Sequence, residues 1–157
     1  MLTGIINGIV FNPFLLRFEE ADIVIKDDRI LHVGDSSEFK LDKVYDVRGS
    51  YVIPGFIDIH FHIESTFLLP AKLAYEMVKH GTLTIVADPH EIANTTGLDG
   101  VLELIKLSKG LPLTIYYQVP SCVPASEYED TPYKLGLKEW IKLLELKEVI
   151  AIGEVMS

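Results

Sequence analysis

The feature that most restricts the fold of this chain is a regular alternation of apolar runs and amphipathic segments after Pro54. Short apolar runs with the composition of strands occur at residues 52–59, 82–87, 113–119 and 149–152. Between them, apolar stripes and terminal Pro or Gly residues predict helices at residues 69–81, 98–109 and 137–146. Because strands that alternate with helices form parallel sheets with right-handed crossovers, the sequence predicts an α/β fold with four parallel strands and three helices.

Residues 1–50 follow a different rhythm, in which strand follows strand with no helix between. Strands are predicted at residues 5–10, 21–26, 30–34 and 44–47. A tight turn is expected at residues 27–29, between the second and third of these strands. We therefore expect two domains, a small β module at residues 1–52 and an α/β domain at residues 53–157.

The stretch of residues 51–66 carries the first candidate site. Its apolar part suits a buried strand at the centre of a parallel sheet. Asp58, His60, His62 and Glu64 occupy alternate positions, so they would lie on one face at the end of this strand. Imidazole and carboxylate groups on one surface are what a divalent metal ion needs. A single histidine in a strand is usually only a hydrogen-bonded polar residue, but this pair beside acids favours a metal site.

Polar or conformationally special residues also follow the other three predicted strands of the α/β domain. Asp88, His90 and Glu91 follow the second strand, Cys122 lies between two prolines after the third, and Glu154 follows the fourth. Parallel α/β folds build their active sites at this edge of the sheet. Asp and Pro are also common just before a helix, which is the alternative for Asp88. Cys122 is interpreted as a small buried residue.

The composition restricts the partners and the compartment. The chain has 14 Lys and Arg against 23 Asp and Glu, a net charge of −9, which argues against nucleic acid as a partner. No apolar run reaches the length of a membrane-spanning helix, and the N-terminus lacks the basic region of a signal peptide, so no membrane partner is expected. The one cysteine cannot form an intrachain disulfide, which fits a cytoplasmic protein.

Four motifs carry a resemblance to a known family. They are His60-Phe61-His62-Ile63-Glu64-Ser65, Ala87-Asp88-Pro89-His90-Glu91-Ile92-Ala93-Asn94, Pro120-Ser121-Cys122-Val123-Pro124-Ala125 and Gly153-Glu154-Val155-Met156. In order and spacing they resemble the bacterial and archaeal adenine deaminases of the amidohydrolase superfamily. The resemblance implies a (β/α)8 TIM-like barrel, of which residues 53–157 would be the first half, and a composite β-sandwich that includes residues 1–52.

The resemblance also implies roles for individual residues. His60 and His62 match metal ligands on the first strand, and Glu154 matches a carboxylate that bridges two metal ions. His90 is expected as a further metal ligand. Asp88, Glu91 and Glu64 are expected as catalytic or substrate-facing groups.

The activity that the resemblance implies is hydrolysis of adenine, a small purine base, to hypoxanthine and ammonia, a step of adenine catabolism or purine salvage. It implies a binuclear divalent metal site, with Mn²⁺ as the first expectation and Fe²⁺ or Zn²⁺ as alternatives. A dihydroorotase or hydantoinase relative is a competing reading. Those enzymes carry a carboxylated lysine on the fourth strand, where this chain has Glu154.

A complete site in this family needs two more histidines and an aspartate from later strands of the barrel. His32 and His80, in the β module and at the end of a helix, do not replace them. The chain alone is therefore expected to be inactive, and to associate with itself as a homo-oligomer or with a complementary C-terminal half. The alternative is a truncated remnant that binds metal or a partner without catalysis.

Overall fold

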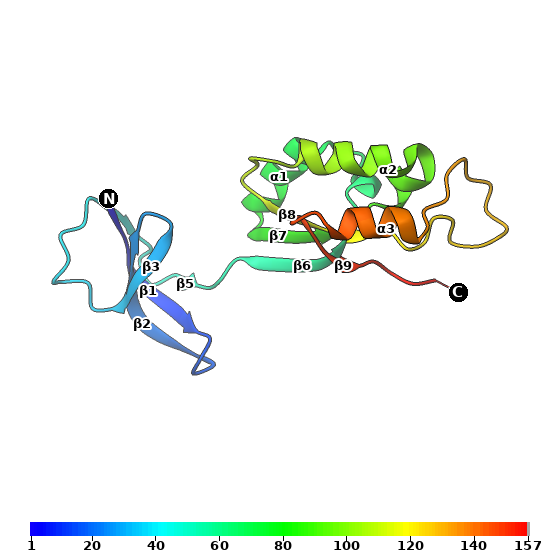
Figure 1. Ribbon diagram of the computed structural model, residues 1–157. Helices are drawn as coiled ribbons and strands as arrows, with labels where there is room; N and C mark the ends of the chain where they lie inside the picture. The colour runs from blue at the N-terminus through cyan, green and yellow to red at the C-terminus, as the bar shows by residue number, and fades with distance from the viewer. Residues whose placement is uncertain (157) are drawn as a thin grey trace. The chain divides into compact units, whose positions relative to one another are not determined.

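The computed structural model describes residues 1–156 and divides into two compact units, which meet in the sequence between Pro54 and Gly55. The first unit is a five-stranded sheet, shown in blue and cyan in Figure 1. Its strands are β1 (Leu2–Asn12), β2 (Arg17–Lys26), β3 (Arg29–Gly34), β4 (Lys43–Asp46) and β5 (Tyr51–Val52). The order is β3-β2-β1-β4, β5 also pairs with β1, and only β1, β2 and β3 pair in antiparallel fashion. Each of the four strands predicted in this region overlaps one of the strands β1 to β4, and the turn between β2 and β3 lies where it was expected.

The second unit is a four-stranded parallel sheet with helices on one face, which confirms the predicted α/β fold. The strands lie in the order β6-β7-β8-β9. Figure 1 shows α1 and α2 side by side along this face. The bounds are β6 (Phe56–Phe61), η1 (Glu64–Thr66), α1 (Pro70–Lys79), β7 (Thr82–Ala87), α2 (His90–Leu107), β8 (Thr114–Val119), α3 (Leu137–Leu144) and β9 (Val149–Ile152).

The core of the second unit lies between this sheet and its three helices. Along β8 the buried residues are Ile115, Tyr117 and Val119, as the two-residue period of a strand requires. They pack with buried residues of the helices, such as Leu73 and Val101. Burial raises the pKa of Tyr117 to about 12, and its hydroxyl contacts the Ser108 hydroxyl at 2.6 Å. Tyr117 is therefore a packing residue.

The first strand of the second unit differs from its prediction. A buried central strand was expected, but β6 pairs only with β7 and is an edge strand. Phe56 is 57% exposed and Ile59 is 73% exposed. The apolar composition of this strand is typical of a strand that is buried on both faces of a sheet. Among residues 1–156, however, no strand pairs with the outer edge of β6. The alternation also stops early, because β6 ends at Phe61 and Glu64 begins the short helix η1.

Helix α2 starts earlier than its prediction. Helical structure was expected from Leu98, but α2 begins at His90 and contains a break at Gly97. Gly97 has φ 65° and ψ −154°, a conformation that side chains other than hydrogen disfavour. The predicted helix therefore matches only the second segment of α2. The first segment carries His90 and Glu91 in its first helical turn.

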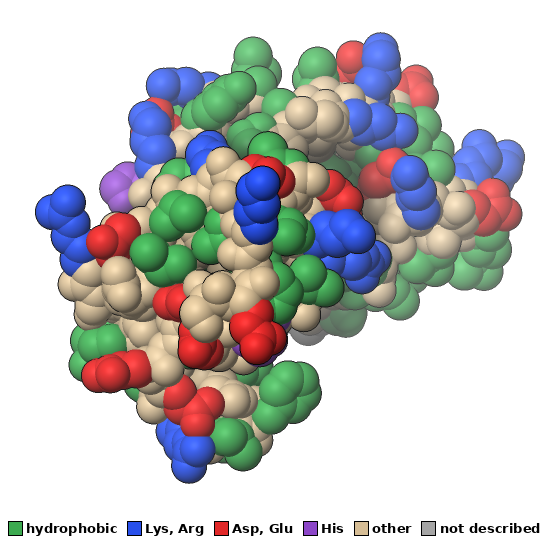
Figure 2. All heavy atoms as spheres, turned by 90° about the vertical axis from the view of Figure 1, so that its left-hand side faces the viewer, with side chains coloured by type: hydrophobic (Ala, Val, Ile, Leu, Met, Phe, Trp, Pro, Cys, Tyr) green, Lys and Arg blue, Asp and Glu red, His purple; other side chains and the backbone are tan. Residues whose placement is uncertain are grey.

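The surface carries both signs of charge. Figure 2 shows one face of the molecule, on which Lys and Arg side chains are scattered among acidic and hydrophobic ones. No helix within residues 1–156 combines the length and the apolar composition that crossing a bilayer requires.

Candidate metal centre

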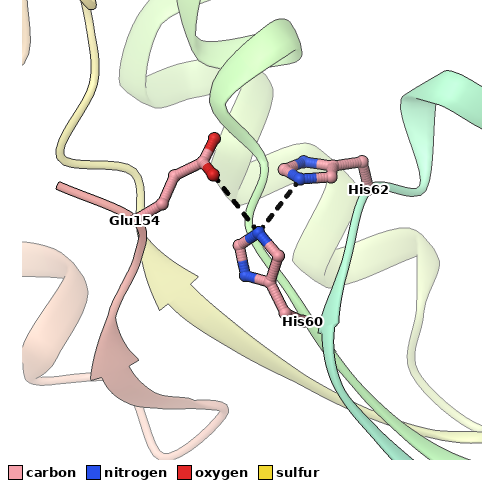
Figure 3. A group of neighbouring side chains, drawn as sticks. All are labelled: His60, His62 and Glu154. Carbon is pink, nitrogen blue, oxygen red and sulfur yellow. Dashed lines mark hydrogen bonds and ion pairs between the residues drawn. The ribbon is translucent and has the colours of Figure 1, made fainter. Parts of the chain in front are cut away.

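Side chains from three strand ends of the second unit converge at the carboxyl edge of its sheet. His60 and His62 come from the end of β6, His90 follows β7, and Glu154 follows β9. Nε2 of His60 lies 3.2 Å from Nε2 of His62 and 3.4 Å from Oε2 of Glu154, as the dashed lines in Figure 3 mark. The structure therefore brings together the three residues that the sequence singled out first as metal ligands.

Hydrogen bonds fix the ring orientation of both histidines. Nδ1 of His62 lies 3.1 Å from the backbone oxygen of Asp88, which can only accept. Nδ1 of His60 lies 3.2 Å from Oε1 of Gln118, whose amide nitrogen donates to the oxygen of Ile59 and so orients the acceptor. A proton on Nδ1 satisfies these acceptors and leaves Nε2 of each ring free to bind a metal ion. Sequence reasoning missed Gln118; the available signal was its place on β8 between the buried residues Tyr117 and Val119, which puts it on the opposite face of the strand from them.

The Nε2 atoms of His60 and His62 lie 3.2 Å apart, a separation that two nitrogen ligands of one metal ion can adopt. Oε2 of Glu154 adds a third electron donor on the same side. Neutral imidazole nitrogen and carboxylate oxygen are ligands that suit zinc, manganese and iron. The donor set therefore fits a divalent metal ion.

Glu154 joins this group to a second one. Its other oxygen, Oε1, lies 3.4 Å from Nδ1 of His90, and the same nitrogen lies 3.8 Å from Oδ1 of Asp88. Asp88 is wholly buried, and its Oδ2 accepts the backbone N–H of Glu154 at 2.9 Å. Burial raises the pKa of Asp88, and the hydrogen bond from Glu154 partly offsets this rise. Asp88 does not cap α2, which was the alternative for it, because that helix start has no side-chain cap.

Glu91 and Glu64 lie beside these groups. Oε1 of Glu91 accepts the Ser65 hydroxyl at 2.6 Å, and its Oε2 lies 3.5 Å from Nδ1 of His62. Oε1 of Glu64 accepts the backbone N–H of Ile92 at 3.0 Å, and burial raises the pKa of Glu64. Asp58 is not part of any of these groups, so the expected row of four side chains is reduced to two histidines.

Several buried polar atoms at this edge of the sheet have no hydrogen-bond partner among the described residues. Four of them belong to predicted site residues: Glu64 Oε2, Asp88 Oδ1, His90 Nδ1 and Glu91 Oε2. A buried polar atom without a partner costs about 1–3 kcal/mol, so their concentration at one place needs a compensating ligand. A bound cation would compensate it, which is a second observation in favour of a metal ion.

The backbone of Glu154 is held by the segment after β8. The Ser121 hydroxyl and the Cys122 thiol both donate to the oxygen of Glu154, at 2.5 Å and 2.7 Å. Cys122 also accepts the N–H of Met156 at 3.3 Å. Cys122 is buried, as expected. The sequence predicted only that it fills space in the core, whereas its thiol also holds the backbone of the candidate ligand Glu154.

The sequence matches known proteins over most of its length. The profile of the amidohydrolase family matches residues 51–154. The adenine deaminase of Kosmotoga olearia is 43% identical over 152 residues, which are 96% of this chain and 26% of that protein. The adenine deaminase of Thermosipho africanus is 41% identical over 154 residues, again 96% of this chain and 26% of the relative. The chain thus spans about a quarter of the length of these curated relatives.

Solved structures show the same architecture. The L-hydantoinase (dihydropyrimidinase) from Arthrobacter aurescens superposes with a TM-score of 0.58 at 26% identity, over 75% of this chain and 28% of that one. An N-acyl-D-glutamate deacylase from Bordetella bronchiseptica, solved with zinc and a phosphonate inhibitor, gives a TM-score of 0.59 at 18% identity, over 87% of this chain and 33% of that one. The second likeness concerns the fold alone. Together they confirm that β6 to β9 and their helices form the first half of a (β/α)8 barrel.

Proposed function

This chain belongs to the amidohydrolase family, and we propose that it supplies the metal-binding half of an enzyme that hydrolyses adenine to hypoxanthine and ammonia. The observation that carries the proposal is the convergence of the Nε2 atoms of His60 and His62, 3.2 Å apart, with Oε2 of Glu154, which lies 3.4 Å from Nε2 of His60. The choice of adenine rests on the curated relatives, which are 39–43% identical to this chain and are named adenine deaminases.

His60, His62 and Glu154 are the proposed ligands of the first metal position, with Mn²⁺ as the expected ion and Fe²⁺ or Zn²⁺ as alternatives. A divalent ion at this place would supply a hydroxide nucleophile at neutral pH by lowering the pKa of water. The chain's own residues set the geometry: Gln118 and the backbone of Asp88 hold the two imidazole rings, while Ser121 and Cys122 hold the backbone of Glu154.

Glu64 and Glu91 are the proposed proton-handling groups. Release of ammonia requires a proton for the leaving amine, and a carboxyl group with a raised pKa retains its proton closer to neutral pH. Burial raises the pKa of Glu64 in this way, and its Oε2 has no partner among the described residues. Glu91 lies between His62 and His90 and would receive or pass on a proton there. Asp88 has no exposed atoms with which to meet a substrate, so its proposed role is to position Glu154.

Turnover is proposed to need a second polypeptide segment. The side chains of His60 and Glu154 are 41% and 35% exposed, so the described residues do not enclose a purine base or exclude water from it. The edge strand β6 and its exposed apolar residues offer a place where further barrel strands would pair. We place this activity in the cytoplasm, because Cys122 is a free thiol with a structural contact.

The test is a complementation assay with manganese. The 157-residue chain is assayed alone and after mixing with the unmatched C-terminal part of the Kosmotoga olearia relative, and hypoxanthine and ammonia are both measured. We expect turnover of adenine only in the mixture, and none when the mixture contains His62→Gln. His80→Gln is the matched control, because His80 is an exposed histidine outside the metal groups.

Each outcome of that assay is decisive. Turnover by the chain alone would show that no second segment is needed. If the two parts form a complex by size-exclusion chromatography but adenine remains unchanged, the proposed substrate is wrong. Hydantoin is included as a competing substrate, and its hydrolysis would support the hydantoinase reading, which Glu154 at the place of the carboxylated lysine argues against.

A further inference from the structure

We propose that two copies of this chain close one eight-stranded barrel and share a metal centre between them. In this dimer, β9 of one copy pairs in parallel with β6 of the other, at two equal junctions. Each junction brings His60 and His62 of the second copy next to Glu154 of the first. The inference rests on the proposed function for the identity of the metal ligands, but neither adenine nor turnover enters it.

The two outer edges of the parallel sheet are unprotected against pairing. Among residues 1–156, no strand pairs with the free side of β6 or with the free side of β9. Both strands expose apolar side chains: Ile59 on β6 is 73% exposed, and Ile150 on β9 is 54% exposed. Edge strands of soluble proteins commonly carry Lys or Pro residues that prevent pairing, and neither strand contains one. Both edges are therefore suited to accept a further strand.

A second copy satisfies both edges at once. All four strands run parallel, so a strand that joins β9 must run in the same direction. β6 of a second copy does so when that copy is rotated by half a turn about an axis along the strands. Because β6 to β9 form half of a (β/α)8 barrel, two copies supply the eight strands that closure needs. β9 contains no charged residue, so the junction brings no like charges together.

The metal centre has room for a ligand on the side of β9. His60, His62 and Glu154 supply three ligand atoms, and a divalent transition metal takes four or more. Figure 3 shows His60 and Glu154 pointing toward each other, 3.4 Å apart, although they come from opposite edges of the sheet. In the closed barrel, β6 of the second copy is the direct neighbour of β9, and adjacent strands lie about 4.8 Å apart. An imidazole of the second copy is therefore placed to take the fourth position.

A ligand from the second copy couples metal binding to dimerisation. An ion that binds the dimer more tightly than the monomer must strengthen the dimer by the same factor, because binding equilibria are reciprocal. Couplings between two sites typically amount to about 5- to 150-fold in affinity. An ion bound within one copy alone would leave the association unchanged, so the response of the dimer to metal reports the shared ligand.

Sedimentation velocity of the 157-residue chain at several concentrations, with Mn²⁺ or with a chelator, tests both parts of the inference. We expect monomer and dimer without larger species, and a dimer dissociation constant that Mn²⁺ lowers by about 5- to 150-fold. His62→Gln should dimerise like the unsubstituted chain in the chelator and lose most of the response to Mn²⁺. His80→Gln is the matched control and should keep the response, because His80 lies outside the metal groups.

Two edge substitutions test the pairing of β9 with β6. Each junction joins β6 of one copy to β9 of the other, so Ile59→Lys alone or Ile150→Lys alone damages both junctions. A mixture of the two variants contains dimers with one intact junction and should dimerise more strongly than either variant alone. Ile141→Lys, at an exposed apolar position on α3, is the control and should dimerise normally. Circular dichroism reports whether each variant is folded.

Several results would overturn the inference. A chain that stays monomeric, or that associates only with the C-terminal part of the Kosmotoga olearia relative, would show that its edges take another segment. Open-ended oligomers, or a mixture that dimerises no better than either variant, would rule out the closed barrel. A dimer that binds Mn²⁺ without being strengthened would rule out the shared ligand.

The outcome is independent of the adenine assay. No substrate is used, so a wrong substrate in the proposed function leaves the dimer and its response to Mn²⁺ untouched. Equilibrium dialysis of the same samples measures Mn²⁺ binding directly. If the folded chain binds no Mn²⁺, the proposed metal centre itself fails, and the shared ligand fails with it.

Discussion

The carboxylate of Asp88 accepts the backbone N–H of Glu154 at 2.9 Å, so a side chain from the end of β7 sets the position of the ligand that follows β9. The two residues are far apart in the sequence and are brought together by the parallel order of the strands. Asp88 is wholly buried, which makes this contact insensitive to solvent. A hydrogen bond at the carboxyl edge of the sheet therefore positions one candidate ligand of the metal centre.

Gly153→Ala tests this contact. A Cβ at position 153 would collide with the carboxylate of Asp88, and Asp88 cannot move away because it is buried. We expect the variant to lose about 1–3 kcal/mol in its free energy of unfolding, the usual cost of overpacking, and to lose metal affinity. Urea unfolding and manganese titration measure the two effects. Gly136→Ala is the control: its Cβ would only meet Glu139 Oε2 at 3.7 Å, so metal affinity should stay unchanged. Equal metal affinity in both variants would contradict the importance of the Asp88–Glu154 contact.

Cys122→Ala and Cys122→Ser separate the hydrogen bond of the thiol from its volume. The thiol donates to the oxygen of Glu154, and its sulfur accepts the N–H of Met156. Alanine removes both interactions and should lower the free energy of unfolding by about 1–3 kcal/mol, whereas serine keeps a donor and an acceptor and should cost less. Chemical denaturation provides the measurement. If serine is as destabilising as alanine, Cys122 contributes only its packing.

Glu64→Gln should stabilise the metal-free chain, by an amount that depends on pH. Burial raises the pKa of Glu64 in the folded state, so the contribution of its neutral form is fully present below the unfolded pKa and is lost as pH rises through the folded pKa. The neutral glutamine escapes this loss and can still accept the N–H of Ile92. The melting temperature of the variant should therefore exceed that of the unsubstituted chain at pH 7, and the two should converge near pH 4. A difference that grows toward acid pH would have the wrong sign.

Ile59→Lys should reduce self-association of the isolated chain. Ile59 is 73% exposed on the edge strand β6, and an unpaired apolar edge promotes pairing between sheets. A lysine there should raise the monomer fraction in sedimentation velocity without lowering the melting temperature, because the side chain contributes little to the core. Ile141→Lys, at an exposed position on α3, is the control and should leave association unchanged. Equal effects of both substitutions would show that the edge has no special role.

The alternation of strands and helices could be predicted because it is local. Residues at strand and helix spacing identified β7, β8, β9 and the second segment of α2, and their alternation predicted that the strands run parallel. The exposure of β6 could not be predicted, because an apolar strand looks the same in sequence whether or not a neighbour pairs with it. The early start of α2 was missed because Gly97 separates its two segments.

The candidate ligands could be predicted, and the residues that hold them could not. His60, His62 and Glu154 stand out by residue type at the ends of apolar runs. Gln118 and Cys122 are ordinary in sequence, and their roles depend on distances across the sheet edge. The division of Glu154 between two groups is also invisible in sequence, because it depends on which oxygen faces each histidine.

The positions of His60 and Glu154 have a consequence for how this chain resists unfolding. His60 lies in β6 and Glu154 follows β9, and these are the two outermost strands of the parallel sheet. An ion held by both residues would be a reversible cross-link between the two edges, and the chain between them would form one long closed loop. Closing a long loop removes conformational freedom from the unfolded chain, and the stabilisation grows slowly with loop length. Metal supply would then regulate the lifetime of the folded sheet much as redox conditions regulate a protein with a disulfide.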